Sequence, residues 1–157
     1  MGTKSRRFPW LLALSLLLWP ATAAAWPGKV VGVTDGDSIT VLHEGRGGQI
    51  RLSGIDCPEK NQDFGTRAKH ITSILVLAKV VEVDPVTVDR YGRTVAFVKV
   101  GDTVVNEELI RQGLARVFSR YCGRAICEWW QRLEDEARAA GIVVYAKCHT
   151  AVGVPEK

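Results

Sequence analysis

The pattern of apolar and polar residues predicts short β-strands in the first half of the chain. Residues 29–33, 38–43 and 49–55 are rich in β-branched and aliphatic side chains, which are typical of strands. Between the last two lies Glu44-Gly45-Arg46-Gly47-Gly48, whose composition is typical of a turn. We therefore expect residues 38–55 to form an antiparallel hairpin.

Further strands are predicted after residue 79. Residues 80–84 and 86–88 are strand-like and are interrupted by Pro85, which indicates either an edge strand or a bulge. A turn over residues 89–93 leads into another strand over residues 94–100. These segments continue the sheet that the hairpin begins.

Three segments show the spacing of helices. Apolar residues recur at helical intervals over 68–78, where Thr66 is a suitable N-cap, and again over 105–112 and 126–140. Residues 114–118 are short and extended. Five strands, with one helix after the third and helices at the end, predict an α+β fold: a five-stranded Greek-key β-barrel of the OB type with about three α-helices.

The first 25 residues have the composition of a secretory signal peptide. A basic start is followed by an apolar stretch over residues 8–18, which is short for a membrane span, and by small residues over 21–25. An uncleaved anchor is the alternative, and Arg6-Arg7 is a weak indication of twin-arginine export. We predict an exported protein, periplasmic or secreted, with no membrane association after cleavage.

The remaining chain is long enough for one domain. We expect that domain over residues 26–149, as a monomer, with a flexible tail over 150–157. Three of the 21 basic residues and none of the 17 acidic residues lie in the signal segment, so the mature net charge is +1. Because this balance is nearly neutral, any phosphate-binding surface must be local.

Two carboxylates lie at the ends of the predicted hairpin. Asp37 enters its first strand and Asp56 leaves its second, so pairing around the turn places them roughly opposite each other. Like charges that face each other across a ladder destabilise it by up to about 1 kcal/mol. With Glu59 close behind, this arrangement predicts a cation site. Asp35-Gly36 alone indicates only a tight turn.

Arg51 adds a phosphate-binding group to the same hairpin. A guanidinium binds phosphate through two parallel hydrogen bonds. Arg51 and Asp56 are an odd number of residues apart, so strict alternation would put them on opposite faces. A bulge or a strong local twist near Gly54 would bring them together, and we expect one there.

Four segments resemble motifs of the staphylococcal nuclease (thermonuclease-like) family, in the same order and at comparable spacing. Together they extend the resemblance over nearly the whole mature chain, from Gly28 to about Tyr145. The segments are Val33-Thr-Asp-Gly-Asp37-Ser, Ile50-Arg51-Leu-Ser-Gly-Ile-Asp56-Cys-Pro-Glu59, Asp89-Arg-Tyr-Gly-Arg93 and Val105-Asn-Glu-Glu-Leu-Ile-Arg-Gln-Gly-Leu-Ala115.

The resemblance implies a fold, an activity and a metal site. The fold is an OB barrel with three helices, and the activity is calcium-dependent hydrolysis of phosphodiester bonds in DNA and RNA. Asp37, Asp56 and the main-chain carbonyl of Cys57 would bind the Ca²⁺ ion. An oxygen-only ligand set of this kind favours calcium or magnesium over zinc, which supports the assignment independently.

The resemblance also implies catalytic and substrate-binding residues. Glu59 would position or deprotonate the attacking water, and Arg51 and Arg93 would bind the phosphate. Two guanidiniums and a divalent cation stabilise the charge that develops on the phosphoryl oxygens in the transition state. Tyr91 and Tyr121 match positions where the family places tyrosines around the nucleotide.

Two other functions remain open from the residues. One is a non-catalytic OB module that binds single-stranded nucleic acid by charge and stacking, and the other is a secreted calcium-binding structural domain. Neither function requires Asp37, Asp56, Glu59, Arg51 and Arg93 together. A structural calcium domain also leaves Arg51 and Arg93 unexplained. Ser119 stands where the family would place another tyrosine, so base preference is open as well.

The chain has four cysteines, which allow three disulfide pairings if all are oxidised. Cys122 and Cys127 bracket a short loop before the last predicted helix, whereas that helix would carry Cys148 about 22 Å away at 1.5 Å per residue. We therefore expect a bridge between Cys122 and Cys127, with Cys57 unpaired. Zinc binding by Cys122, Cys127, Cys148 and His149 is the alternative, but the spacing matches no common zinc motif.

Overall fold

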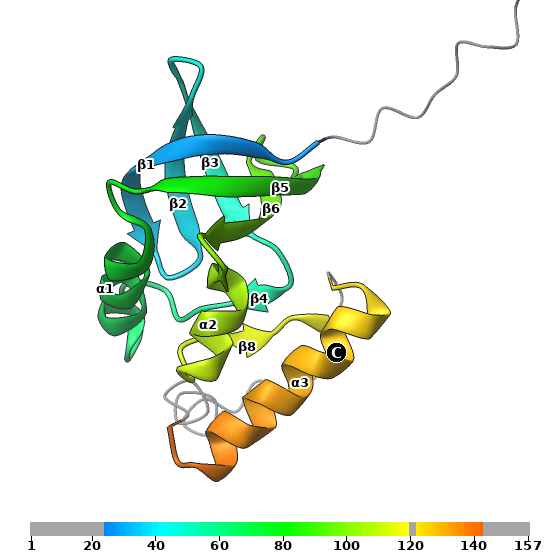
Figure 1. Cartoon of the computed structure of the whole chain (residues 1–157). Helices are drawn as coiled ribbons and strands as arrows, with labels where there is room; N and C mark the ends of the chain where they lie inside the picture. Colours follow the sequence, from blue (N-terminus) through cyan, green and yellow to red (C-terminus); the bar gives the residue numbers. More distant parts are fainter. Residues whose placement is uncertain (1–23, 120–121, 143–157) are drawn as a thin grey trace, which may run out of the picture.

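The computed structural model describes residues 24–119 and 122–142, and Figure 1 shows their arrangement. Residues 1–23 of the predicted signal segment, the tail over 150–157, Tyr121, Cys148 and His149 lie outside the described residues. The helices are α1 (Gly65–Val76), α2 (Val105–Arg111) and α3 (Arg124–Ala139). The strands are β1 (Trp26–Asp35), β2 (Ser38–His43), β3 (Arg46–Leu52), β4 (Ile55–Asp56), β5 (Val80–Val88), β6 (Thr94–Val100), β7 (Thr103–Val104) and β8 (Arg116–Val117).

Five of these strands form a closed barrel. The hydrogen-bonded order is β3-β2-β1-β5-β6, with β7 added beside β6, and a parallel pairing of β3 with β6 closes the circle. A separate two-stranded ladder joins β4 to β8. With three described helices, this architecture confirms the predicted OB-type barrel. In Figure 1, α2 lies between the barrel and the long α3, and the β2–β3 turn projects at the opposite end.

The core forms because strand residues alternate between the barrel interior and solvent. In β5, Val81 and Val83 are fully buried while Glu82 between them is exposed. The helices close the lower end with Leu109 from α2 and Trp130 from α3, both fully buried. Burial of side chains this large stabilises the fold by about 1.5–3 kcal/mol each.

Two local predictions are corrected, and for Pro85 one of the two predicted alternatives is confirmed. The strand predicted over 49–55 divides, because Ser53 and Gly54 form a turn between β3 and β4. Pro85 marks a bulge and not an edge, since β5 pairs with both β1 and β6 and its register shifts between Pro85 and Thr87. Thr66 is inside α1 and does not cap it; the cap position is Phe64, which has a left-handed backbone and makes no side-chain capping bond.

Within the described ranges, no helix is both long enough and apolar enough to cross a membrane.

Candidate active site

The turn between β3 and β4 brings Arg51 to Asp56. Arg51 pairs with Ser38 across the β2–β3 ladder, so the predicted cross-strand pairing of Asp37 with Asp56 is wrong. The chain instead reverses at Gly54, whose φ of +71° favours glycine, and Arg51 Nη2 lies 3.1 Å from Asp56 Oδ1. The bulge or twist that was expected near Gly54 is therefore present as a turn over Ser53 and Gly54.

Arg51 also forms an ion pair with Asp37, so one guanidinium connects the two carboxylates. Both carboxylates direct Oδ1 toward Arg51, and a second donor holds each Oδ2. For Asp37 that donor is the Cys57 backbone N–H at 2.7 Å, and for Asp56 it is Arg116 Nη2 at 3.3 Å. This matching arrangement fixes the orientation of two neighbouring carboxylates.

Cys57 lies at the centre of the charged cluster. Its thiol is buried, and burial raises its pKa far above the ordinary value, an effect that Arg51 partly offsets. The negative charges of Asp56, Asp35 and Glu59 raise the pKa of the thiol further. In the described part of the chain, Cys57 is the free cysteine.

The loop that carries Asp37 packs closely on the helix behind it. Gly36 is buried, and a Cβ atom there would lie 2.7 Å from Cys57 Cβ and 2.8 Å from Ala68 Cβ. The hydroxyl of buried Thr72 in α1 donates to the Gly36 carbonyl at 2.7 Å. Because real Cβ atoms do not approach so closely, glycine is required for Asp37 and Cys57 to lie side by side.

A buried amide holds the Ser53–Gly54 turn. Asn106 in α2 is fully buried; its Nδ2 donates to the Ser53 carbonyl at 2.9 Å, and its Oδ1 accepts from Val98 N at 3.1 Å. From the other side, Cys122 and Trp130 pack on Gly54, where an added Cβ would be 2.9 Å from each. Both sides of the turn are therefore fixed by the protein core.

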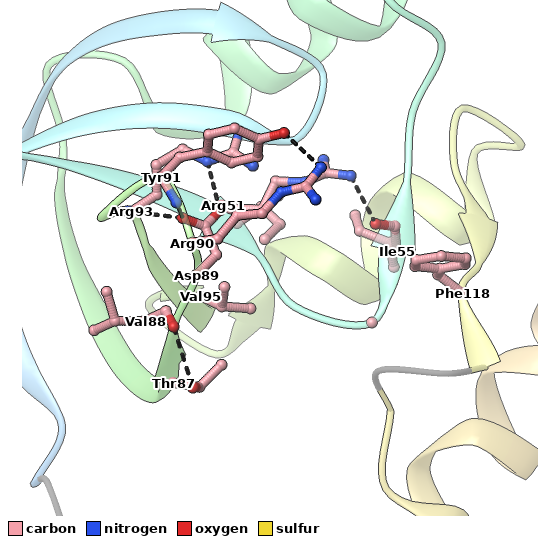
Figure 2. Close-up of a pocket in the computed structure, with 12 residues that line it drawn as sticks. Arg51, Ile55, Thr87, Val88, Asp89, Arg90, Tyr91, Arg93, Val95 and Phe118 are labelled. Atoms are coloured by element: carbon pink, nitrogen blue, oxygen red, sulfur yellow. Dashed lines mark hydrogen bonds and ion pairs between the residues drawn. The ribbon is translucent and has the colours of Figure 1, made fainter.

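A pocket of about 570 Å³ opens beside this turn, and Figure 2 shows its lining residues. Arg51 contributes from β3, Arg93 and Tyr91 from the loop before β6, and Phe118 from the segment after β8. Arg90 lines the pocket as well. Guanidiniums on the wall of an open pocket are suited to bind a phosphate group, while the aromatic side chains offer surface for an attached base.

Arg93 is held in place by its own turn. Arg93 Nε lies 2.8 Å from Asp89 Oδ2, and the Tyr91 and Arg93 backbone N–H groups donate to Asp89 Oδ1. Burial raises the pKa of Asp89, but these hydrogen bonds outweigh it and the net pKa is lowered. The stabilisation is therefore present above the ordinary pKa of an aspartate and is lost as pH falls through the lowered value.

Glu59 lies on the exposed loop after β4, separate from the lining of the pocket. Its backbone N–H donates to Gln62 Oε1 at 2.9 Å, and the Gln62 N–H donates back to the Glu59 carbonyl at 2.8 Å. Gly65, the first residue of α1, lies directly against this peptide, since a Cβ there would overlap the Glu59 carbonyl oxygen. The start of α1 therefore determines where the Glu59 backbone lies.

Gly65→Ala is expected to displace Glu59 and to lower stability by about 1–3 kcal/mol, because a buried overlap forces the backbone to move. Alanine favours a helix more than glycine does, so a loss would come from the overlap and not from helix propensity. Thermal unfolding measures the effect. Gly47→Ala is the matched control, because an added Cβ there meets no atom within 4 Å. Equal stability of the two variants would contradict this contact.

The structure joins Cys122 to Cys127 by a disulfide, with their Cα atoms 5.5 Å apart. The bridge connects the segment after β8 to the first turn of α3, where Cys127 is buried. Because Cys122 packs on Gly54, the bridge also supports the turn between Arg51 and Asp56. Zinc binding by these cysteines would require thiolates that a disulfide does not provide.

Six of the predicted site residues form two groups, and Glu59 lies in neither. Asp37, Asp56, Cys57 and Arg51 form one connected cluster, and Arg51, Arg93 and Tyr91 line the pocket, so Arg51 belongs to both groups. Sequence reasoning did not identify Arg116 and Phe118. Both follow directly after the last family-like motif, at 116 and 118 in an extended segment, and alternation there would have placed them on the same face.

The ligand chemistry around Asp37 and Asp56 fits a hard cation. The available atoms are carboxylate oxygens and main-chain carbonyls, which calcium and magnesium prefer. Among the described residues, no group of three or more His, Cys, Asp or Glu side chains is placed to hold a metal ion. An ion held by these two carboxylates would need main-chain oxygen and water to complete its coordination, a mixture that is usual for calcium and magnesium.

A closed OB-type barrel with neighbouring carboxylates and guanidiniums has groups suited to bind a phosphate-bearing ligand. The sequence model described as "Staphylococcal nuclease homologue" matches residues 49–146. A protein named ParB from Escherichia coli is 36% identical over 149 residues, covering 87% of this chain and 84% of the relative. The protein belongs to the staphylococcal nuclease family.

Two other relatives carry nuclease names. A micrococcal nuclease from Shigella flexneri is 34% identical over 137 residues, which are 82% of this chain and 76% of the relative. A thermonuclease from Staphylococcus hyicus is 41% identical over 99 residues, which are 56% of this chain and 57% of the relative. The similarity therefore extends over most of the domain that the barrel and helices form.

Proposed function

We propose that the protein is an exported nuclease that hydrolyses phosphodiester bonds of DNA and RNA and requires calcium. The single observation that carries the proposal is Arg51, which contacts the paired carboxylates of Asp37 and Asp56 and also lines the pocket that contains Arg93. One side chain thus connects a cation site to a phosphate site. Membership of a family with nuclease-named relatives supports the same function.

In this proposal, Asp37, Asp56 and the Cys57 carbonyl hold the calcium ion. When bound, the ion supplies positive charge that stabilises the phosphoryl oxygens. The protein holds Oδ2 of each carboxylate with another donor, while Oδ1 of each is ion-paired with Arg51, so the ion would share these oxygens with the guanidinium.

Arg51 and Arg93 bind and orient the phosphate. Each offers a planar fork that matches two phosphoryl oxygens, and the charge on those oxygens grows as the transition state forms. Arg93 is held through Nε by Asp89, so its guanidinium has a defined orientation. Tyr91 lies beside the Arg93 guanidinium, with 5.5 Å from the guanidinium carbon to the ring centroid, and would contact the nucleotide.

Glu59 acts on the attacking water as its general base. Its exposed position leaves the carboxylate accessible to solvent, while Gly65 and Gln62 fix its backbone. A positioned base of this kind contributes about 10²–10⁴-fold to a rate. Tyr121 remains part of the proposal as a second nucleotide contact, on the evidence of the sequence motif.

The purified mature chain is expected to degrade plasmid DNA, single-stranded DNA and RNA when calcium is present, and to stop when a chelator removes the ion. Agarose and denaturing gels measure the products. Binding of single-stranded DNA without cleavage at any calcium concentration would instead identify the non-catalytic OB module. Calcium binding with neither cleavage nor nucleic-acid affinity would identify a structural calcium domain.

A further inference from the structure

We propose that Arg116 is a positioning residue that fixes Asp56 for cation binding; the inference rests on the proposed function. Arg116 lies in β8, directly across the two-stranded ladder from Asp56 in β4. Its Nη2 atom is 3.3 Å from Asp56 Oδ2, whereas Arg51 Nη2 is 3.1 Å from Oδ1. The two arginines therefore hold opposite oxygens of one carboxylate.

The backbone that carries Arg116 is anchored on both sides. The Phe118 N–H donates to the Gly54 carbonyl at 2.9 Å, and the Val117 N–H donates to Glu134 Oε2 of α3 at 2.8 Å. Arg116 thus projects from a fixed strand, and its hold on Asp56 Oδ2 is a constraint relative to the core. Arg51 cannot supply this constraint, because it contacts Oδ1, the oxygen on the side toward Asp37.

Asp37 shows what a donor that holds Oδ2 does to a carboxylate at this site. Its Oδ2 accepts the Cys57 backbone N–H, so its Oδ1 alone faces Arg51. Arg116 gives Asp56 the same restriction, although Asp56 has a side chain that is 29% exposed whereas Asp37 is nearly buried. Without Arg116, the more exposed carboxylate would rotate more freely. A ligand that must be reoriented before it binds an ion lowers the affinity for that ion.

Arg116 also carries a positive charge, which opposes a nearby cation. Loss of this charge would strengthen calcium binding, whereas loss of the hold on Asp56 would weaken it. The larger of the two effects decides the result. The Arg116 side chain is 35% exposed, so solvent screens its repulsion to a small factor in affinity. Loss of a partner that orients a metal ligand typically costs 10- to 100-fold in metal affinity. We therefore expect the loss of Arg116 to weaken calcium binding.

Arg116→Met is expected to weaken calcium binding about tenfold, measured by titration calorimetry of the mature chain with calcium chloride alone. Arg116→Lys keeps the charge but loses the planar fork, so its affinity should lie between those of the methionine variant and the wild type. Arg111→Met is the control, because Arg111 is an exposed α2 residue that pairs with Glu107, and its calcium affinity should be unchanged.

Cleavage rates separate positioning from direct catalysis. Arg116 is not among the residues that line the described pocket, so saturating calcium should restore the turnover of Arg116→Met to within a few-fold of wild type. Thermal unfolding confirms that each variant is folded. Unchanged or tighter calcium binding in Arg116→Met would overturn the proposal, as would a rate loss that calcium does not restore.

Failure of the proposed function would look different. A wild-type chain that neither binds calcium nor cleaves nucleic acid would overturn both the nuclease proposal and this one. A wild-type chain that binds calcium and cleaves, while Arg116→Met matches it at every calcium concentration, would overturn only the role of Arg116.

Discussion

Arg93→Lys is expected to lower the turnover of DNA cleavage about 100-fold or more while the protein remains folded. Lysine keeps the positive charge but replaces a planar fork with a single ammonium group, so it cannot bind two phosphoryl oxygens at once. It also cannot reproduce the Nε–Asp89 ion pair that orients the guanidinium. Steady-state cleavage of a defined oligonucleotide measures the loss.

The expected loss should appear in kcat more than in KM, because the phosphate carries its greatest charge in the transition state. Arg111→Lys is the control, since Arg111 is exposed on α2 and pairs with Glu107 and Glu108. Turnover of Arg93→Lys within a few-fold of wild type would show that Arg93 only stabilises the Asp89 turn.

Glu59→Gln should reduce cleavage by about 10²-fold or more without a measurable change in stability. Glutamine has nearly the same shape but cannot accept a proton from water. Because the Glu59 side chain is exposed and the Gln62 hydrogen bonds involve its backbone, the substitution leaves the loop intact. Steady-state cleavage and thermal unfolding together measure both parts of this expectation.

Glu82→Gln, on the exposed side of β5, provides a matched control and should behave as wild type. Turnover of Glu59→Gln within a few-fold of wild type would assign the base to another group.

The sequence predicts the barrel well because local patterns determine most of it. The 38–43 strand, the 94–100 strand and the end of the second helix near Gly113 all follow from alternation, periodicity and glycine placement. The start of α1 was missed because Phe64, an apolar residue with φ of +67°, occupies the cap position, where a polar residue was expected. Packing determines that end of the helix.

Part of the site was predictable because its residues lie close together in the sequence. Asp37, Arg51 and Asp56 lie within one short stretch, and Gly54 between them indicated a local distortion. The Arg116 contact was not predictable from local pattern, because it joins residues 60 positions apart through a two-residue ladder. Phe118 reaches the pocket through the same long-range pairing, whose register no short-range pattern specifies.

The closing pair of strands has a consequence for local stability. Arg51 lies opposite Val95 in the parallel β3–β6 pairing that closes the barrel, and Arg93 lies in the loop one residue before β6. The backbones of β3 and β6 separate at this seam only if the barrel opens, which requires an opening free energy near that of global unfolding. Glu59, on an exposed loop, belongs to a region that opens at lower cost. On warming, the loop that carries Glu59 should therefore loosen first, while Arg51 and the start of β6 keep their places until the barrel itself unfolds.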